Sequence, residues 1–206
     1  TEHLAGLRNL GFNRLSIGVQ SLNNHELEQL DRQHSGAQAL EAVRAARNAG
    51  FENINIDLIF GLIDQPLRRW QETLEGVLEL EPAHLSCYAL TVEPGTHLYY
   101  RVQKGELSEP DPDVVADQYE WTRERLAEAG YEHYEISNWA QHGKACTHNL
   151  VYWNAAPYLG IGAGAHSFFT GQRFANVESP QRYVELVDAS IEQRASEGSG
   201  TLQQVA

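Results

Sequence analysis

Three side chains have types and positions that suit the binding of a polar ligand, namely Gln20, Arg32 and Asp57. Gln20 lies near the carboxyl end of a predicted strand, and Asp57 is the only charged residue of the apolar stretch Asn53–Leu62. Because an unpaired ionised carboxylate is costly in a dry interior, Asp57 needs a partner, access to solvent or a ligand. Gly61 marks the turn out of this strand, and α/β folds bind substrates at the carboxyl ends of strands.

The chemistry of these three side chains allows two interpretations. The guanidinium of Arg32 can hold a carboxylate in a two-pronged contact, while Gln20 and Asp57 can exchange hydrogen bonds with hydroxyl and amino groups. Alternatively, Arg32 and Asp57 form a salt bridge with each other, since interior acids usually find an arginine, and Gln20 is a solvated strand end. The spacing by itself leaves both interpretations open.

Length, charge and cysteine content limit the class of protein. With 206 residues the chain can bury a substantial core, as one large domain or as a domain with an extension. The net charge of −13 argues against a broad electrostatic grip on nucleic acid or anionic membranes. Two cysteines, no cleavable signal and no apolar run of about 18 residues predict a soluble cytoplasmic protein without a disulfide or a membrane span. Because methionine is absent throughout, we expect the chain to be an excised part of a longer protein.

The elements that position these residues follow a βα rhythm. Strands alternate with helices at intervals of about 30 to 40 residues, which is typical of right-handed βα units in a parallel sheet. Apolar residues are expected to dominate both faces of the stretch 53–62, as in a strand that helices cover. The pattern predicts, in order, a helix over 2–11, a strand over 14–20, helices over 25–30 and 35–48, a strand over 53–62, a helix over 67–80 and a strand over 84–92.

The second half of the chain carries a weaker pattern. An exposed connection is expected over 105–113, and the acids of 106–117 are interpreted as a solvated face. Gly160, Gly162 and Gly164 are expected on one face of an extended segment, where something approaches the backbone closely. The remaining predictions are a helix over 114–129, a strand over 131–139, an amphipathic helix over 180–189 and a flexible tail over 196–200.

Several motifs recur together in register along the first half of the chain. They are Arg14–Ser21 (RLSIGVQS), Arg32–His34 (RQH), Asn55–Leu62 (NIDLIFGL) and Thr91–Thr96 (TVEPGT). In this combination the chain resembles the radical S-adenosylmethionine (SAM) family of oxygen-independent coproporphyrinogen III oxidase.

Within that family, three later segments resemble the haem chaperones of the HemW type. They are Tyr134–Ala140 (YEISNWA), Cys146–Trp153 (CTHNLVYW) and Tyr158–Ser167 (YLGIGAGAHS). The segments Glu135–Asn138 and His148–Trp153 favour the chaperone over the oxidase, because the oxidases differ there.

The resemblance implies a fold, cofactors and site residues. The expected fold is α/β, the C-terminal part of a partial (βα)6 radical SAM barrel of the TIM type with a β-rich extension. Residues 1–112 would supply the last three βα units, and residues 113–206 a helix and sheet extension. Gln20, Arg32 and Asp57 match family positions that contact SAM.

The chain departs from the family pattern in one major respect. The family holds a 4Fe-4S cluster on a three-cysteine motif, CxxxCxxC, in its first βα loop, and neither Cys87 nor Cys146 can supply it. Also missing are the glycine-rich segment and the acidic residue that would contact SAM from earlier strands. No metal ligand for the cluster is therefore expected in this chain. Ile63 stands where relatives usually have proline, which bears on that loop's conformation only.

His148 is the preferred candidate for ligation of haem iron. Its imidazole can bind iron, and the neighbouring rings of Tyr152 and Trp153 can pack on a porphyrin. A lone histidine near aromatic residues can equally be structural, and Cys146 is a second ligand candidate that would have to ionise. His166, which follows the three glycines, is expected to be a hydrogen-bonded structural histidine.

We therefore interpret the chain as part of a HemW-like radical SAM protein that binds SAM, a 4Fe-4S cluster and haem. Such a protein delivers haem to acceptor proteins. The alternative is an oxygen-independent coproporphyrinogen III oxidase, which decarboxylates the propionates of its substrate through a 5′-deoxyadenosyl radical. A third option is that this piece is inactive alone, as an open half-barrel whose unpaired strand edge invites aggregation. The sequence assigns no catalytic residue.

Overall fold

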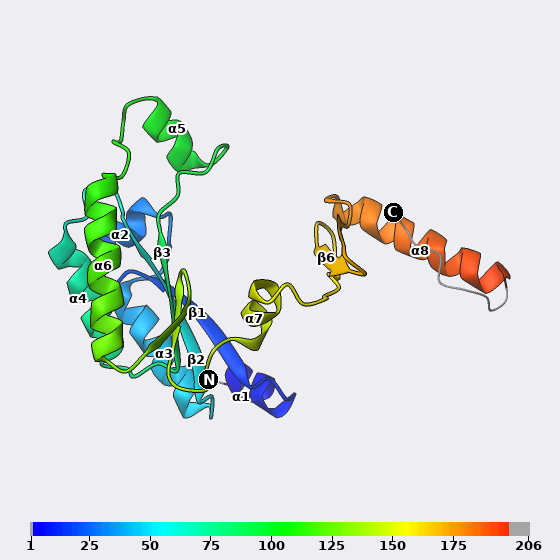
Figure 1. Ribbon diagram of the computed structural model, residues 1–206, viewed down its shortest axis with the longest axis horizontal. Coiled ribbons are helices and arrows are strands. Elements are labelled where there is room, and N and C mark those ends of the chain that lie inside the picture. The colour runs from blue at the N-terminus through cyan, green and yellow to red at the C-terminus, as the bar shows by residue number, and fades with distance from the viewer. Residues whose placement is uncertain (1, 198–206) are drawn as a thin grey trace. The chain divides into compact units, whose positions relative to one another are not determined.

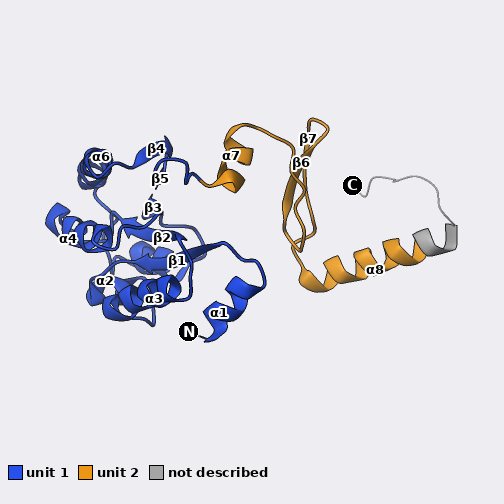
Figure 2. Cartoon of the chain, turned by 90° about the horizontal axis from the view of Figure 1, so that it is seen from below, with its two compact units in different colours: residues 1–145 blue, residues 146–206 orange. Residues whose placement is uncertain are grey.

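The computed structural model describes residues 2–197 and divides the chain into two compact units, Thr1–Ala145 and Cys146–Ala206 (Figure 2). Helix α6 (Pro112–Glu128) belongs to unit 1, so the units meet further along the chain than residue 112. The division into domains 1–112 and 113–206 stays a prediction about the complete protein.

Unit 1 is built on a five-stranded sheet in the order β1-β2-β3-β5-β4 (Figure 1). Strands β1 (Arg14–Gln20), β2 (Asn53–Phe60) and β3 (His84–Ala89) are parallel. Strands β5 (Asn138–Ala140) and β4 (Glu132–Glu135) continue the sheet in antiparallel fashion. The three parallel strands confirm the predicted βα units, and β1 and β4 form the two edges of this sheet.

Local sequence signals set the helix boundaries of unit 1. The side chain of Asn23 caps α2, and Ser35 begins α3 through a capping box with Gln38. Gly50 follows α3 with a φ of +88°, a conformation that a residue without a Cβ adopts without strain. The helices of this part are α1 (Glu2–Asn9), α2 (Asn24–Gln29), α3 (Gly36–Asn48) and α4 (Leu67–Leu78).

Two segments of unit 1 differ from the predicted elements. Strand β3 ends at Ala89, and the short helix α5 (His97–Gln103) follows, because the hydroxyl of Thr96 accepts a hydrogen bond from a backbone N–H of its first turn. The single strand predicted over 131–139 is instead the hairpin β4-β5. The carboxylate of Glu135 accepts the N–H of Ser137 and thereby stabilises the turn between the two strands.

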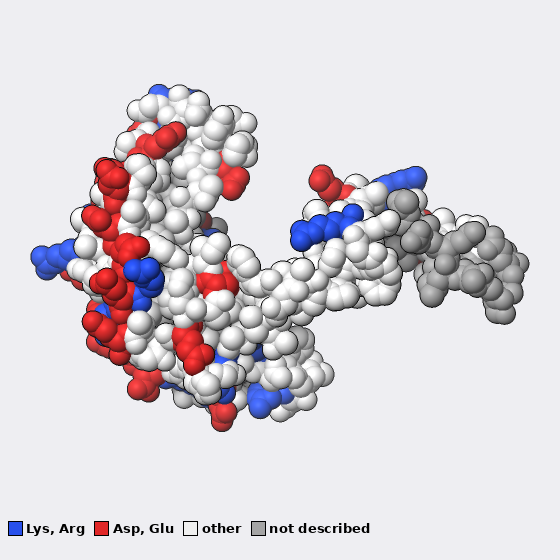
Figure 3. All heavy atoms as spheres, viewed as in Figure 1, with Lys and Arg blue, Asp and Glu red and all other residues white. Residues whose placement is uncertain are grey.

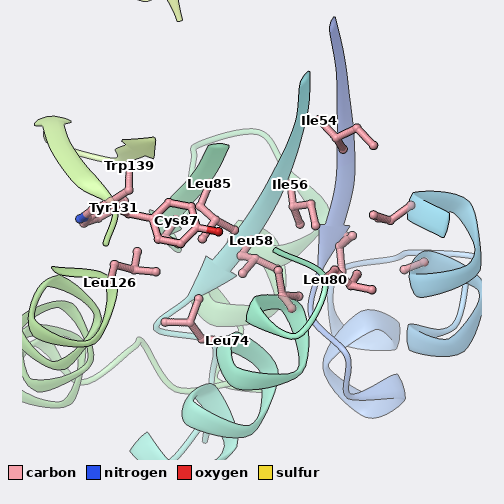
Figure 4. Packing of buried hydrophobic residues seen from close by; sticks show 14 of the residues in the cluster. Ile54, Ile56, Leu58, Leu74, Leu80, Leu85, Cys87, Leu126, Tyr131 and Trp139 are labelled. Carbon is pink, nitrogen blue, oxygen red and sulfur yellow. The ribbon is translucent and has the colours of Figure 1, made fainter. Parts of the chain in front are cut away.

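The two faces of the sheet differ in polarity. In β2, Ile54, Ile56 and Leu58 are at most 1% exposed and belong to the hydrophobic core between the sheet and the helices (Figure 4). Helices α2, α3, α4 and α6 all lie on this side (Figure 2). The alternate residues Asn55 and Asp57 lie on the opposite face, because successive side chains of a strand point to opposite sides. The expectation that apolar residues dominate both faces of this strand was therefore wrong.

The exposed side of α6 is acidic (Figure 3). Asp113, Asp117, Glu120 and Glu124 are all exposed at helical spacing. The acids of 106–117 are likewise exposed, which confirms the predicted solvated face. The negative charge of the chain is thus carried partly by a surface that solvent screens.

Unit 2 consists of a short helix, a two-stranded sheet and a long helix. Helix α7 (Thr147–Trp153) is followed by the two-stranded sheet of β6 (His166–Phe169) and β7 (Gln172–Ala175), and then by α8 (Pro180–Glu197). The helix predicted over 180–189 is confirmed and is longer than expected. The tail predicted to be flexible begins within α8, and its residues 198–200 lie outside the described residues.

The three spaced glycines of unit 2 have different roles. A Cβ on Gly160 would lie 2.2 Å from the carbonyl oxygen of His166, so the predicted close approach is made here by the chain's own backbone. Gly162 and Gly164 have φ values of +107° and +69°, which are turn conformations. The prediction of one extended segment carrying all three glycines on one face was therefore wrong.

The buried hydrogen bond between α4 and α6 should contribute measurably to stability. The indole N–H of Trp70 donates to Thr122 Oγ1 at 2.7 Å, and both side chains are 0% exposed. Thr122→Val keeps the shape but leaves the indole N–H without an acceptor, so the free energy of unfolding should fall by about 1–3 kcal/mol. Urea denaturation followed by circular dichroism measures this. Thr122→Ser retains the hydroxyl and is the control; an equal loss in both variants would contradict the assignment.

Candidate functional site

Asp57 lies half-buried in the middle of β2, on the polar face of the sheet. Its Oδ2 accepts a hydrogen bond from Ser16 Oγ at 2.8 Å, and its Oδ1 accepts one from Asn55 Nδ2 at 2.8 Å. Asn55 Nδ2 also donates to Ser16 Oγ at 2.6 Å. Neutral donors therefore support the carboxylate, and about two of its roughly four acceptor positions remain for donors of a ligand.

Gln20 ends β1 next to Asp57. The register between β1 and β2 shifts here, so that Gly18 pairs with Asp57 and Gln20 with Leu58. The φ of Gln20 is +66°, a conformation that costs energy for a residue with a side chain and that clusters at functional sites. A Cβ on Gly18 would lie 2.6 Å from Gln20 Nε2. The absence of a side chain at Gly18 therefore lets the Gln20 amide lie over the strand position beside Asp57.

Arg32 lies in the exposed loop between α2 and α3. The backbone N–H of Arg32 donates to the carbonyl oxygen of Leu27 at 2.9 Å, and His34 Nε2 lies 3.1 Å from the carbonyl oxygen of Val19. The second contact ties the loop to the end of β1, next to Gln20. The alternative salt bridge between Arg32 and Asp57 is not formed within the described residues, where Asp57 is held by the neutral donors above.

A buried carboxylate holds the loops that follow β1 and β2. Glu26 is 0% exposed, and its Oε2 accepts from Ser21 Oγ at 2.6 Å and from Gln65 Nε2 at 3.1 Å. Its Oε1 lies 3.6 Å from Arg69 Nη1. Because Ser21 directly follows Gln20, this cluster supports the strand end on which the candidate site depends.

Further polar residues lie on the same face of the sheet, and the sequence analysis did not predict them as part of the site. Asn55 Oδ1 lies 2.6 Å from His84 Nδ1, and His84 Nε2 lies 2.7 Å from Tyr134 Oη. Ser86 Oγ donates to Asn138 Oδ1 at 2.6 Å, and the Asn138 amide donates to a carboxylate of the hairpin turn. The signal for these residues was present as polar residues at alternate positions of neighbouring strands.

Burial controls the protonation of two residues here. Desolvation, with a smaller contribution from the charge of Arg14, lowers the pKa of His84 to about 3, so its imidazole is neutral. Burial, and to a lesser degree the charge of Asp57, raises the pKa of the Cys87 thiol. Since metal binding and nucleophilic attack both need a thiolate, Cys87 acts as a core residue.

The histidine proposed for haem lies in unit 2. His148 is exposed on α7, with its Nε2 2.9 Å from Tyr152 Oη, and the Tyr152 ring meets the Tyr158 ring edge-on at 4.6 Å. Trp153, the next residue, is 54% exposed. His148 therefore lies beside the predicted aromatic surface. His166 is exposed and makes no side-chain hydrogen bond among the described residues, so its expected role as a hydrogen-bonded structural histidine was wrong.

Unit 1 thus belongs to the class of α/β sheet proteins with helices on one face. The other face carries a network of polar side chains on parallel strands, and α/β folds bind ligands at the carboxyl ends of such strands. Among the described residues, no helix is both long and apolar enough to cross a membrane.

Comparison with known proteins agrees with this class. Residues 1–77 match the family model of the Radical SAM superfamily. Proteins named "Heme chaperone HemW" from Mycobacterium tuberculosis and Bacillus subtilis are each 40% identical over 186 residues, which is 90% of this chain and 48% and 49% of theirs. A mouse protein named "Radical S-adenosyl methionine domain-containing protein 1, mitochondrial" is 44% identical over 169 residues, 82% of this chain and 38% of its own.

A solved structure extends the likeness to the fold. Coproporphyrinogen III oxidase (HemN) from Escherichia coli, described as a radical SAM enzyme, matches with a TM-score of 0.74 and 27% sequence identity. The match covers 91% of this chain and 46% of that one. The chain belongs to the radical SAM superfamily, and it spans about half the length of the HemW relatives it matches.

The neutral state of His84 should make the fold sensitive to acid. An unfolded histidine takes up a proton below its ordinary pKa of about 6.5, whereas His84 in the folded chain resists protonation until about pH 3. The stabilising contribution is therefore full above pH 6.5 and is lost as the pH falls toward 3, by about 1.4 kcal/mol per pKa unit of difference.

Urea unfolding at several pH values tests this against His84→Gln, whose amide can replace both hydrogen bonds without titrating. The stability of the original chain should fall more steeply between pH 6.5 and 4 than that of the variant. Parallel curves for the two proteins would show that His84 is not the acid-sensitive group.

Proposed function

We propose that this chain is the SAM-contacting half of a HemW-type protein that binds haem and delivers it to acceptor proteins. The observation that carries the SAM part is the placement of Gln20, at the end of β1, beside Asp57 on the adjacent strand β2, with the Arg32 loop tied to the same end of β1. The 40% identity to proteins named as HemW haem chaperones supports the haem part. Activity and partners of the complete protein are inferred from these relatives.

The donor and acceptor set fits SAM. The sulfonium ligand carries a methionyl carboxylate, an amino group and ribose hydroxyls. Arg32 is exposed and has no ion-pair partner among the described residues, so its guanidinium is available to a carboxylate. The open acceptor positions of Asp57 and the amide of Gln20 suit hydroxyl and amino groups.

The 4Fe-4S cluster must be held by residues outside this chain. Cluster iron is bound by thiolates at close spacing, and the buried, protonated Cys87 does not fit that role. When bound in the complete protein, the cluster would supply the electron that radical SAM chemistry requires. The residues described here would bind and orient SAM beside it.

The haem part of the proposal rests on unit 2. An exposed imidazole at His148 and exposed rings at Tyr152 and Trp153 give an iron ligand beside apolar surface. The pair of His148 and Tyr152 is linked at 2.9 Å, which orients the imidazole.

The structural likeness to HemN supports a second candidate function, that of a coproporphyrinogen III oxidase. A TM-score of 0.74 to a coproporphyrinogen III oxidase means that the fold is compatible with oxidative decarboxylation. A direct assay with coproporphyrinogen III separates the two functions. Turnover by the complete protein would favour the oxidase, and its absence together with haem transfer would favour the chaperone.

The SAM assignment predicts selective loss of affinity. In the complete protein, Asp57→Ala or Arg32→Ala should weaken SAM binding by about 1.5–3 kcal/mol, roughly tenfold or more, through loss of a charge-assisted contact. Gly18→Ala should also weaken binding, because the new Cβ would displace the Gln20 amide, whose flexible end can move while the strand remains. Isothermal titration calorimetry measures all three.

Arg68→Ala is the matched control for these variants, because Arg68 is an exposed arginine of α4 paired with Glu72 on its own helix. It should bind SAM with unchanged affinity. Unchanged affinity in both the Asp57 and the Arg32 variants would remove the proposed site.

The haem assignment predicts a spectral change. His148→Ala should shift the Soret band of bound haem and lower affinity, while ring packing on Tyr152 and Trp153 retains some binding. Optical titration of the complete protein with haem measures both.

His166→Ala is the control, since this second exposed histidine of unit 2 has no place in the proposed site. It should leave the spectrum and the affinity unchanged. If the His148 variant behaves like the original protein, the ligand is Cys146 or lies outside this chain.

A further inference from the structure

A series of hydrogen bonds, buried at its centre and part-buried at both ends, runs across the sheet to Asp57, and the proposed SAM contacts do not use it. It begins at Tyr134 on β4, passes through His84 on β3 and Asn55 on β2, and ends at the Asp57 carboxylate. His84 is 1% exposed and Asn55 is 4% exposed. Polar groups this well buried require satisfied partners, and each link here is 2.6–2.8 Å long.

The donor-to-acceptor direction of these hydrogen bonds follows from Asp57. An ionised carboxylate can only accept hydrogen bonds, so the Asn55 amide must present its Nδ2 hydrogens to Asp57. The amide oxygen of Asn55 then faces His84, whose Nδ1 must carry a hydrogen to donate to it. In a neutral imidazole the other nitrogen, Nε2, is an acceptor, and the hydroxyl of Tyr134 is placed to donate to it.

The arrangement leaves Asn55 one amide orientation. Its Nδ2 divides its two hydrogens between Asp57 Oδ1 and Ser16 Oγ, and Ser16 passes its own hydrogen to Asp57 Oδ2. If the Asn55 amide turned over, its oxygen would face Asp57 Oδ1 and the lone pairs of Ser16 Oγ. Its NH2 group would then face the donating Nδ1 of His84. Both carboxylate oxygens of Asp57 thus depend on this orientation of the Asn55 amide, which His84 Nδ1 and Ser86 Oγ support as donors to Asn55 Oδ1 at 2.6 and 3.2 Å.

We propose that Asn55 and His84 are positioning residues for the SAM site, which hold the Asp57 carboxylate in the one orientation that presents its remaining acceptor positions to the ligand. This inference rests on the proposed function of Asp57. The lowered pKa of His84 is consistent with it, because a neutral ring keeps one nitrogen as the acceptor for Tyr134. Preorganised acceptors bind a ligand more tightly because less ordering remains to be done on binding.

A double-mutant cycle on SAM affinity in the complete protein tests the proposal. His84→Leu should weaken SAM binding about 3- to 10-fold when Asp57 is present, and should have little effect in the Asp57→Asn background, because there is no carboxylate left to orient. His84→Gln should restore most of the affinity, since its amide can donate to Asn55 and accept from Tyr134. Tyr134→Phe removes the hydrogen bond to His84 Nε2 and leaves His84 in place, so it is the milder variant if His84→Leu fails to fold.

Thr122→Val is the stability control. Thr122 is as deeply buried as His84 but belongs to helix α6, on the other side of the sheet, so its loss should lower the unfolding midpoint and leave SAM affinity unchanged. A general effect of destabilisation on binding would lower affinity in this variant also, and would overturn the proposal.

A spectroscopic test follows the tautomer. In the complete protein labelled with 15N-histidine, the His84 resonances, assigned by their loss in His84→Gln, should report a protonated Nδ1 and an unprotonated Nε2. Asp57→Asn replaces the acceptor-only carboxylate with an amide that can also donate, so Asn55 is no longer held in one orientation and the balance should shift toward Nε2–H. An Nε2–H tautomer of His84 in the original protein would contradict the proposed direction of these hydrogen bonds and overturn the proposal.

The outcomes separate this proposal from the one on which it depends. If Asp57→Asn weakens SAM binding but the His84 variants do not, or if their effects add without coupling, the SAM site stands and the positioning role is overturned. If Asp57→Asn itself leaves affinity unchanged, the proposed SAM site fails, and the positioning role fails with it.

Discussion

The structure of unit 1 depends on how a carboxylate is accommodated in the middle of a sheet. Asp57 is supported by the hydroxyl of Ser16 and the amide of Asn55, which are neutral donors from its own and the neighbouring strand. An arginine partner would have neutralised the acid and closed the site. Neutral donors satisfy part of its capacity and keep its charge, so the acid can be held within the fold and still serve a ligand.

This solution requires a sheet with two different faces. Helices α4 and α6 pack against the apolar residues of β2 and β3, and burial of these side chains supplies the hydrophobic stabilisation of the unit. The other face is then free to be polar. Its amides, hydroxyls and one neutral imidazole satisfy one another across the strands, which removes the cost of burying them.

The strand end of β1 shows how the backbone contributes to the same site. Gly18 makes room for the Gln20 amide, and Gln20 itself adopts a left-handed conformation. Both features are unfavourable in an ordinary strand, because a glycine weakens pairing and a positive φ is strained. The buried cluster around Glu26 holds the following loop and offsets this cost. Backbone strain at this strand end, beside Asp57, is consistent with the proposed role in SAM binding.

The sequence by itself determined the parallel βα units and the helices that begin near residues 25 and 35, and it singled out Gln20, Arg32 and Asp57 as candidate binding residues. These follow from local periodicity, capping chemistry and motifs, which do not depend on distant contacts. Only the tertiary structure decided that Arg32 and Asp57 do not pair and that the 131–139 segment turns back on itself. It also decided that His84 and Asn55 stand behind Asp57, because strand register brings together residues 29 positions apart in the chain. A single sequence shows which side chains alternate along a strand, whereas which of them meet across strands is set by the packing of the whole sheet.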